Sequence, residues 1–561
     1  MVEQNNNQTR QADEIFTEFK EHSVAEFFRK NKQMLGFSGK VKSLTTIVHE
    51  YVTNALDACE EAGILPEITV KITQLGDDQY YLKVTDNGPG IPTTHVGRVF
   101  GTMLAGTKFH RYMQQRGQQG IGATGCTMYA QLTTGKPLRI KTSTGQGKVF
   151  ECNMGIDVKT NQAVMTNIQE YDEEFRGTEV SGEFGDVKYE RSEYGPLEYL
   201  KRTAIANPHA EISFVDPEGK KVRFPRVLEI IPEQPEEIKP HPLGIEAHDL
   251  FEYMKRSEAK KLSIFLLNEL SRVSQSKINE IQKRIPEIDF DSPPNTLTWE
   301  DAKRLVKQFK IVKWVAPSAE ALRPIGNEHI EISLRSLLKP EFISVRSRSP
   351  KVYKGGVPFI VEAGIVYGGK AGKVNQSGYK SSEILRYANR SPLLFDAGAC
   401  ATHKSVKAID WKRYEIRNFD DAPISVFVNV VSAFVPYTGA GKQSISSEPE
   451  IADEIKFAVM DVARDLNKYI SGKVREERKD AKRKAIMRYI KQLSLALPEL
   501  ANSGNSEEIE RKLSAIVLDK FAVSESTEDD EVETRDIMIE EDDYDGDGES
   551  EDKIEFDDED M

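Results

Sequence analysis

Three polar residues at helical spacing mark the first place in this sequence where chemistry could be done. Glu50, Asn54 and Asp57 are separated by four and then three residues, inside an apolar-periodic run from residue 41 to residue 59. This spacing predicts one helix that carries all three side chains on one face. A carboxylate can orient a water molecule and take its proton, and an amide oxygen is a ligand that Mg²⁺ accepts. Taken alone, the triplet would also fit a solvated polar face.

Two glycine-containing stretches follow this predicted helix. A strand-like run over residues 80–85 leads into a turn that holds Asp86, Gly88 and Gly90. Residues 117–125 then read Gly-Gln-Gln-Gly-Ile-Gly-Ala-Thr-Gly, and their unhindered N–H groups could form a concavity for phosphates. The loop is not a Walker A motif, because no Lys-Ser or Lys-Thr follows the glycines. It is not a dinucleotide fingerprint either, because the polar residues 111–116 before it do not read as a strand.

Helix, acidic turn and glycine loop, in this order, resemble the nucleotide pocket of the GHKL ATPase superfamily. The resemblance implies ATP as the substrate and Mg²⁺ as the cofactor. It makes Glu50 the base for the hydrolytic water, Asp86 the acceptor for the adenine amino group, and Asn54 a magnesium ligand through ATP. The threonine hydroxyl of a later Gly-Thr pair would support Asp86. The implied ATP-binding residues are Asn54, Asp57, Asp86, Gly88, Gly90, Thr107, Lys108, Gly117, Gln118, Gln119, Gly120, Ile121, Gly122, Ala123, Thr124, Thr178 and Lys442.

A second candidate catalytic residue lies far along the chain. Residues 439–443 read Gly-Ala-Gly-Lys-Gln, a flexible loop that presents Lys442. The resemblance implies that this lysine reaches back to the γ-phosphate and reports whether ATP is intact. A point-charge ammonium suits such a role, because its attraction ends when the terminal phosphate leaves. The alternative is a solvated loop lysine.

Three further passages resemble the ATPase subunits of the topoisomerase VI family of archaeal type IIB topoisomerases. They are residues 23–28 (Ser-Val-Ala-Glu-Phe-Phe), residues 266–274 and residues 387–395 (Tyr-Ala-Asn-Arg-Ser-Pro-Leu-Leu-Phe). The resemblance implies an α+β chain: a GHKL (Bergerat) ATPase α/β sandwich, a helical helix-two-turn-helix insert, and an α/β transducer domain with a long C-terminal helix. The expected segments are an N-terminal strap (1–38), the ATPase domain (39–228), the helix-two-turn-helix domain (229–308), the transducer (309–470), a stalk helix with a docking segment (471–523) and an acidic disordered tail (524–561).

The pattern beyond residue 309 predicts alternating strands and helices. Strands are expected at residues 311–315, 358–364 and 425–431, and helices at residues 381–389 and 448–468, joined by βαβ crossovers.

A basic run over residues 471–492 predicts a long helix, whose basic side chains either form a solvated face or make it a DNA-facing stalk. An amphipathic helix over residues 507–521 could dock a partner or pack on the stalk. The insert likewise could touch nucleic acid or serve as a rigid spacer, and the strap could pack on its own chain or cross to a second copy.

Charge is distributed unevenly along the chain. The last 37 residues, 525–561, hold 21 acidic and two basic residues. The net charge of the whole chain is −14, and the net charge of the residues before this segment is +5. This composition predicts an acidic disordered tail on a mildly basic body. The four cysteines, Cys59, Cys126, Cys152 and Cys400, lie far apart and predict reduced, mostly buried thiols, with no zinc site. No apolar run has the length of a membrane span and no signal peptide is recognisable, so we expect a cytoplasmic, nucleoid-associated protein.

The resemblance implies a function and a set of partners. Two copies would dimerise when ATP binds, capture double-stranded DNA without reading its sequence, and drive the DNA-cleaving A subunit of topoisomerase VI within an A2B2 heterotetramer. The chain carries no Glu-Gly-Asp-Ser signature of a cleavage module and no phospho-accepting histidine arrangement of a sensor kinase. Two alternatives stay open: a MutL-like ATPase clamp of DNA repair, and a scaffold that binds the nucleotide without hydrolysing it.

Overall fold

The computed structural model describes residue 32 and residues 36–103, 113–117, 122–157, 160–374, 378–439 and 441–532, with side chains as far as residue 519. The predicted strap lies almost wholly outside these residues, as does the tail beyond residue 532. The chain divides into two compact units, residues 1–469 and residues 470–561. No helix in the described ranges combines the length and apolarity that a bilayer crossing needs.

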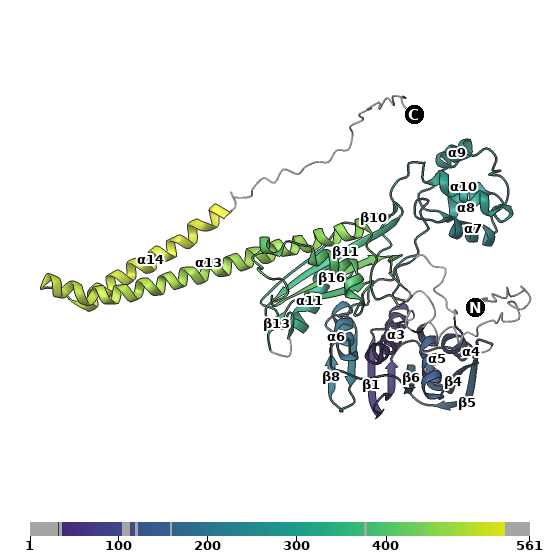
Figure 1. Ribbon diagram of the computed structural model, residues 1–561, viewed down its shortest axis with the longest axis horizontal. Helices are drawn as coiled ribbons and strands as arrows, with labels where there is room; N and C mark the ends of the chain where they lie inside the picture. Colours follow the sequence, from purple (N-terminus) through teal and green to yellow (C-terminus); the bar gives the residue numbers. More distant parts are fainter. Residues whose placement is uncertain are drawn as a thin grey trace, which may run out of the picture. The chain divides into compact units, whose positions relative to one another are not determined.

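The first layer of the larger unit is an eight-stranded sheet within the described residues (Figure 1), in the order β5-β4-β3-β6-β2-β1-β7-β8. All neighbouring strands are antiparallel except β1 and β7, which run parallel. The strands are β1 (Glu67–Gly76), β2 (Gln79–Asp86), β3 (Leu138–Thr144), β4 (Lys148–Asp157), β5 (Gln162–Asp172), β6 (Arg176–Phe184), β7 (Glu211–Val215) and β8 (Lys221–Phe224).

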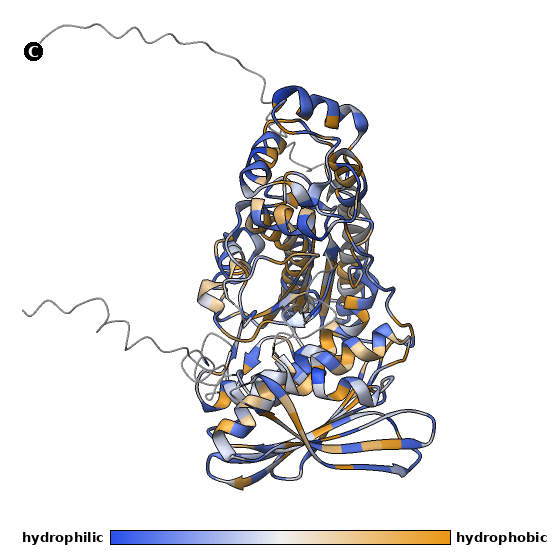
Figure 2. Cartoon of the chain, turned by 90° about the vertical axis from the view of Figure 1, so that its right-hand side faces the viewer, coloured by the Kyte–Doolittle hydropathy of each residue, from blue (hydrophilic) through white to orange (hydrophobic). Residues whose placement is uncertain are grey.

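Helices cover one face of this sheet (Figure 1): α3 (Lys40–Glu61), α4 (Thr93–Gly101), α5 (Gly122–Thr134) and α6 (Pro196–Ala206). Burial alternates along β1 and β2, so each strand turns one set of side chains to the helices and the other to solvent. The same alternation of polar and apolar residues is visible along the strands in Figure 2. The predicted helix around residues 41–59 and the predicted strand at 80–85 are therefore confirmed.

A small helical cluster follows a stretch without regular structure over residues 225–240. It contains α7 (Ala247–Arg256), α8 (Leu262–Glu269), α9 (Gln275–Arg284) and α10 (Trp299–Phe309), packed around a core of their own. The strand predicted at residues 311–315 is wrong, because this segment forms a turn and an irregular connection. Val312 instead packs into the helical core, and the Trp314 indole N–H donates to the Phe309 carbonyl at 2.7 Å.

A second sheet comes next, built on two largely buried strands, β11 (Val357–Tyr367) and β16 (Ile424–Ser432). These confirm the strands predicted at residues 358–364 and 425–431. Around them lie α11 (Asn327–Leu338), β9 (Phe342–Ser347), β10 (Lys351–Tyr353), β14 (Glu383–Ala388), β15 (Ser391–Pro392) and α12 (Ala401–Lys407), with the short pair β12 (Lys373–Val374) and β13 (Lys380–Ser381) beside them.

The helix predicted at residues 381–389 is wrong, because β14 occupies that segment. The apolar residues Ile384, Leu385 and Ala388 imitate helical spacing, but pairing with β16 overrides this local pattern. The β14 and β16 strands are parallel, and the connection between them carries α12, so the sheet has one βαβ-like crossover among the described strands. Its other described pairs are antiparallel.

Two long helices end the described chain. Helix α13 (Pro449–Ala501) confirms the helix predicted at residues 448–468 and continues through the basic run, and α14 (Ser506–Val532) includes the predicted amphipathic helix. Helix α14 continues to Val532, past residue 524, where the acidic tail was predicted to begin. Glutamate is a good helix former, so acidic composition alone did not mark the end of this helix. The four cysteines are buried and none forms a disulfide, as predicted.

Candidate nucleotide site

The site is organised by α3, which presents opposite chemistry on its two faces. Leu44, Val48 and Val52 are fully buried against the sheet, whereas Glu50 is half-buried and Asn54 is exposed. The apolar spacing fixes the rotation of the helix, and this rotation directs the polar stripe away from the core. The prediction that Glu50, Asn54 and Asp57 share a helical face is confirmed by this helix, although Asp57 is buried.

Glu50 lies against the first residue of α5. A β-carbon built on Gly122 would stand 1.8 Å from Glu50 Oε2, so only glycine leaves room for the carboxylate in this position. The first turn of a helix presents N–H groups without intrahelical partners and a partial positive charge, which favours anions. The start of α5 can therefore bind a negative group, and Glu50 stands at its edge.

The acidic turn after β2 is held by backbone donors. The N–H groups of Gly88 and Thr178 donate to Asp86 Oδ1 at 2.9 and 3.1 Å. Burial raises the pKa of the Asp86 carboxyl to about 6, and these two hydrogen bonds oppose the rise. Because both bonds use Oδ1, Oδ2 is the atom that could accept a hydrogen from an adenine amino group.

Two glycines are required for this turn to close. Gly90 has φ +73° and a β-carbon there would lie 2.1 Å from the Ser143 carbonyl oxygen. Gly177 has φ +115° and a β-carbon there would lie 2.0 Å from the Asp86 carbonyl oxygen. We expected the Thr178 hydroxyl to support Asp86, but the backbone N–H of Thr178 donates the hydrogen bond to this carboxylate instead. The Thr178 hydroxyl lies 3.3 Å from the Thr142 hydroxyl.

Asp57 belongs to a buried ion-pair network. Its Oδ1 accepts from Arg116 Nη1 at 2.7 Å, and Arg116 Nη2 donates to Glu60 Oε1 at 2.7 Å. Burial raises the pKa of Glu60, but Arg116 and a hydrogen bond from His209 outweigh it and hold the pKa well below its usual range. Sequence reasoning missed Arg116, Glu60 and His209. Glu60 extends the α3 stripe by three residues, which was a usable signal, but its partners come from distant segments.

Lys442, which follows strand β16 of the second sheet in the chain, contacts the backbone of Arg116. Its Nζ donates to the Arg116 carbonyl at 3.2 Å, across 326 residues of sequence. Burial lowers the pKa of His49 on α3; Glu50 opposes this effect, and the positive charge of Lys442 adds to it. The structure thus brings the loop lysine to the residue that precedes the glycine-rich stretch.

The remaining predicted residues divide into two groups. Gly117 and the first turn of α5, including Ala123, are described, and the buried Thr124 hydroxyl lies within hydrogen-bond distance of the carbonyls of Val99 and Thr102. Thr124 therefore has its backbone N–H to offer an anion. Outside the described residues lie Thr107, Lys108, Gln118, Gln119, Gly120 and Ile121.

Mg²⁺ fits this site only as a cation shared with the phosphates. Asn54 supplies one amide oxygen on the exposed face of α3, one turn from Glu50. Within the described ranges no group of three or more His, Cys, Asp or Glu side chains is placed to hold a metal ion.

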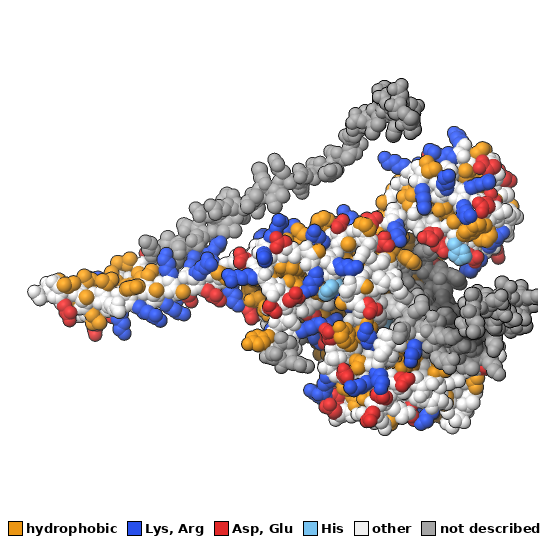
Figure 3. Space-filling model, in the orientation of Figure 1, with side chains coloured by type: hydrophobic (Ala, Val, Ile, Leu, Met, Phe, Trp, Pro, Cys, Tyr) orange, Lys and Arg blue, Asp and Glu red, His pale blue; other side chains and the backbone are white. Residues whose placement is uncertain are grey.

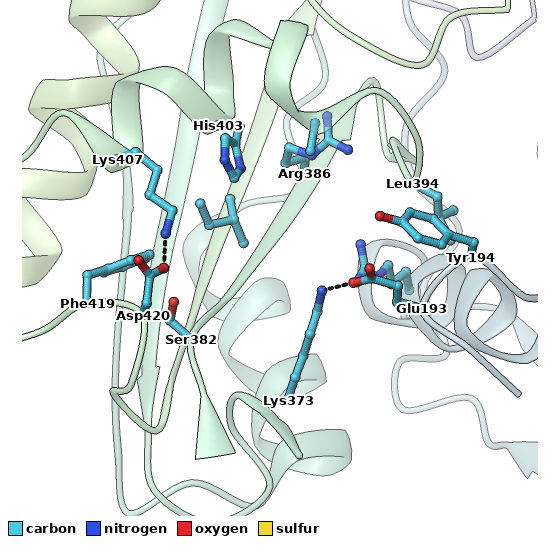
Figure 4. A pocket seen from close by; sticks show the side chains of 13 residues that line it. Glu193, Tyr194, Lys373, Ser382, Arg386, Leu394, His403, Lys407, Phe419 and Asp420 are labelled. Atoms are coloured by element: carbon cyan, nitrogen blue, oxygen red, sulfur yellow. Dashed lines mark hydrogen bonds and ion pairs between the residues drawn. The ribbon is translucent and has the colours of Figure 1, made fainter. Parts of the chain in front are cut away.

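A cavity of about 120 Å³ lies elsewhere, between α6 and the second sheet (Figure 4). Two lysines that line it form ion pairs: Lys373 pairs with Glu193, and Lys407 pairs with Asp420. Each of these two lysines thus already has an acidic partner. The cavity is distinct from the site on α3.

Known proteins share both sheets of this chain. Residues 39–157 match the model of the histidine kinase-, DNA gyrase B- and HSP90-like ATPases, and residues 317–483 match that of the topoisomerase VI B subunit transducer. The B subunit of the type 2 DNA topoisomerase 6 of Pyrococcus horikoshii is 46% identical over 93% of this chain and 99% of its own length. The chain belongs to the family of type 2 DNA topoisomerase 6 B subunits.

The two sheets correspond to two domains of this family. The second sheet is the transducer of a B subunit, and the first sheet is its ATPase layer. The B subunit of Methanothermobacter thermautotrophicus is similar to the chain to the same degree, 47% identical over 84% of this chain and 91% of its own. A solved structure, the ATPase region of Saccharomyces cerevisiae topoisomerase II bound to ICRF-187, is 12% identical with a TM-score of 0.39, over 82% of this chain and 99% of that one.

Proposed function

We propose that this chain is the ATP-hydrolysing subunit of a type IIB DNA topoisomerase, and that it works on DNA in the cytoplasm together with a DNA-cleaving A subunit, hereafter the cleavage subunit. Family membership supports the reaction class. One geometric observation carries the assignment of the site: Glu50 lies against Gly122 at the start of α5. The hydrogen bond from Lys442 to the Arg116 carbonyl adds to it.

Each residue of the site has a defined task in hydrolysis. Asp86 Oδ2 accepts a hydrogen from the adenine amino group, while Gly88 and Gly90 let the turn approach the base. Backbone N–H groups from Gly117 and from the first turn of α5 hold phosphate oxygens. Glu50 orients the attacking water and takes its proton. Asn54 would help the phosphates hold Mg²⁺, and the ion would supply positive charge to the triphosphate.

Asp57 has a different task from the one its position on the helix predicts. Its carboxylate accepts a hydrogen bond from Arg116, so we assign it to positioning the chain that leads into the glycine loop. Lys442 is assigned to the γ-phosphate. Its Nζ already donates to the carbonyl of the residue that precedes this loop, which supports the assignment.

An apolar surface supports the proposed assembly. The helical pair α13–α14 exposes apolar side chains along its length (Figure 3), which suits docking of the cleavage subunit better than a solvated face. These side chains are Tyr489, Leu493, Leu495, Leu497, Leu500, Ile516 and Leu518. We propose that two copies of this chain dimerise when ATP binds and capture a second duplex, that the assembly is A2B2, and that the basic body holds DNA phosphates without reading sequence.

The decisive experiment is a supercoil-relaxation assay of the full chain with a co-purified cleavage subunit. Relaxation that requires both proteins and ATP, and that is lost with Glu50→Ala, is the expected result. The chain alone should hydrolyse ATP and leave DNA uncut. ATP hydrolysis without relaxation in the presence of an active cleavage subunit would instead favour a MutL-like repair clamp, and nucleotide binding without hydrolysis would favour a scaffold.

A further inference from the structure

The sequence motif at residues 387–395 has no role in the function derived so far, yet it joins the two layers. The Tyr387 hydroxyl donates to the Arg202 carbonyl on α6 at 3.1 Å. At the other end of the motif, Leu394 and Phe395 are buried in the hydrophobic core of the ATPase layer, although they follow a transducer strand. The motif is therefore anchored in the ATPase layer at both ends.

The centre of the motif is a two-residue turn between β14 and β15. Ala388 pairs with Ser391, so Asn389 and Arg390 form the loop, with φ +48° and +66°. Two successive residues in the left-handed region are typical of a type I′ hairpin turn, which asparagine tolerates and arginine does not favour. A strained residue of this kind persists when the surrounding structure fixes it.

Asn389 is almost fully buried and its amide makes three hydrogen bonds. Two of them link it to Ser432 at the end of β16: Nδ2 donates to the Ser432 carbonyl at 2.9 Å, and Oδ1 accepts from the Ser432 N–H at 3.0 Å. The third crosses to the ATPase layer, where Nδ2 donates to the Gln115 carbonyl at 3.0 Å. One side chain thus binds a transducer strand and the chain just before Arg116.

Gln114 makes a second attachment of the same segment to the transducer side. Its Nε2 donates to the Arg323 carbonyl at 2.9 Å, and its Oε1 accepts from the Arg323 N–H at 2.7 Å. Gln114 is buried, and its two reciprocal bonds resemble a piece of strand pairing. The Lys442 ammonium donates to the Arg116 carbonyl as well. Three consecutive residues of the ATPase layer, 114–116, are therefore hydrogen-bonded to three residues on the transducer side: Arg323, Asn389 and Lys442.

The held segment is bonded in turn to the nucleotide-facing helix. Arg116 donates to Asp57 and Glu60 on α3, the helix that carries Glu50 and Asn54. It also donates to Asn207 Oδ1 at 2.6 Å, and Asn207 Nδ2 lies 3.3 Å from the Arg390 carbonyl. A continuous set of buried hydrogen bonds therefore runs from α3 to the turn at Asn389 and to β16. Buried polar networks of this kind have discrete arrangements and can transmit a displacement.

We propose that Asn389 is a positioning residue that couples the nucleotide site to the transducer sheet, by binding the Gln115 carbonyl and the end of β16 in one hydrogen-bonded unit. The coupling is additional to Lys442 and needs no contact with the nucleotide. The inference rests on the proposed function, because it takes α3 to be the nucleotide-binding helix.

The test replaces Asn389 with glycine, which keeps the left-handed backbone and removes the amide. Asn167→Gly is the matched control, because Asn167 has φ +51° but is exposed on β5. In the wild type and in the control, a non-hydrolysable ATP analogue should slow backbone hydrogen exchange at residues 430–432. In Asn389→Gly, the analogue should bind with an affinity within threefold of wild type and leave exchange at these residues unchanged.

The second readout is the ratio of strand passage to hydrolysis in the complex with the cleavage subunit. Asn389→Gly should hydrolyse ATP within threefold of wild type and complete at least tenfold fewer relaxation cycles per ATP. If Asn389→Gly does not fold, Gln114→Ala serves instead and should lower the same ratio. Equal exchange and equal ratios in Asn389→Gly and Asn167→Gly would overturn the inference. Failure of the wild-type chain to bind the analogue would overturn the proposed function instead.

Discussion

The carboxylate of Glu50 stands 1.8 Å from the point where residue 122 would carry a β-carbon, so Gly122 and Glu50 occupy adjoining space. This relationship gives the first prediction. In Gly122→Ala, the added methyl group displaces the end of the Glu50 side chain while leaving α5 intact, because alanine favours a helix. A displacement of about 1 Å at a reacting group can lower kcat by roughly 100-fold. We expect that loss in a steady-state ATPase assay, with Gly398→Ala as the control, since nothing lies within 4 Å of a β-carbon there.

Glu50 itself gives the second prediction. Glu50→Gln keeps the size and loses the base, so kcat should fall by about 10²- to 10⁴-fold, the usual contribution of a general base. ATP affinity, measured by equilibrium binding of a fluorescent analogue, should change by less than threefold. Hydrolysis at the wild-type rate would show that another group activates the water.

Asp86 links stability to pH with a defined sign. Because burial raises its pKa from 3.8 to about 6, the folded chain holds a proton there that the unfolded chain has released, and stability falls as pH rises through this window. The free energy of unfolding of wild type relative to Asp86→Asn should fall by about 1.4 kcal/mol between pH 5 and pH 7.5. Urea unfolding of both proteins at each pH measures the difference, and a flat difference would refute the raised pKa.

The same variant separates binding from stability. ATP needs the ionised carboxylate, whereas the amide introduced by Asp86→Asn would present a donor to the adenine amino group. At pH 7.5, Asp86→Asn should therefore weaken ATP binding by at least tenfold although the fold is no less stable. Calorimetric titration checks the affinity, and retained affinity would place the adenine elsewhere.

Lys442 provides the test of nucleotide sensing. Lys442→Ala removes the hydrogen bond to the Arg116 carbonyl and the charge assigned to the γ-phosphate. We expect continued ATP binding and at least a tenfold loss of relaxation cycles per ATP hydrolysed. Lys442→Arg should not restore coupling, because a planar guanidinium differs from a point charge in geometry. Unaltered relaxation by Lys442→Ala would remove the switch from the mechanism.

The apolar surface of α13 and α14 predicts where the cleavage subunit docks. Leu500 is 82% exposed at the end of α13, an unusual position for a large apolar side chain. Leu500→Asp should weaken the complex with the cleavage subunit by at least tenfold in a pull-down or calorimetric titration, and should leave the ATPase activity of the chain alone unchanged. Leu75→Asp, on an exposed leucine of the larger unit, should leave the complex intact.

The sequence predicted the elements whose hydrophobic pattern is local. The apolar stripe of α3 put Glu50 on a helix, and the alternation in β2 put Asp86 in the turn after a strand. The glycines beside Asp86 were signals of that turn. The strand β14 was mistaken for a helix because its partner β16 begins 36 residues after it ends, and no local signal reports such pairing.

The ion-pair network of Arg116 shows a second limit. Its donors and acceptors come from α3, from the chain after α6 and from the β14–β15 turn, and each residue alone reads as an ordinary polar residue. Buried charge becomes recognisable only when the partners are in one place, since an unpaired Arg116 or Glu60 in the core would be strongly destabilising. For the same reason, the sequence did not reveal that Asp57 accepts a hydrogen bond from Arg116.

The hydrogen bond from Asn389 to the Gln115 carbonyl joins residues that are 274 positions apart in the sequence, and this separation matters while the chain is being synthesised. At translation rates of roughly 5–20 residues per second, the ribosome makes residue 389 some 14–55 s after residue 115. During this interval the ATPase layer has been made in full, but Leu394 and Phe395, which complete its apolar core, have not. The apolar core of the ATPase layer therefore lacks two of its buried side chains until the ribosome has made residue 395.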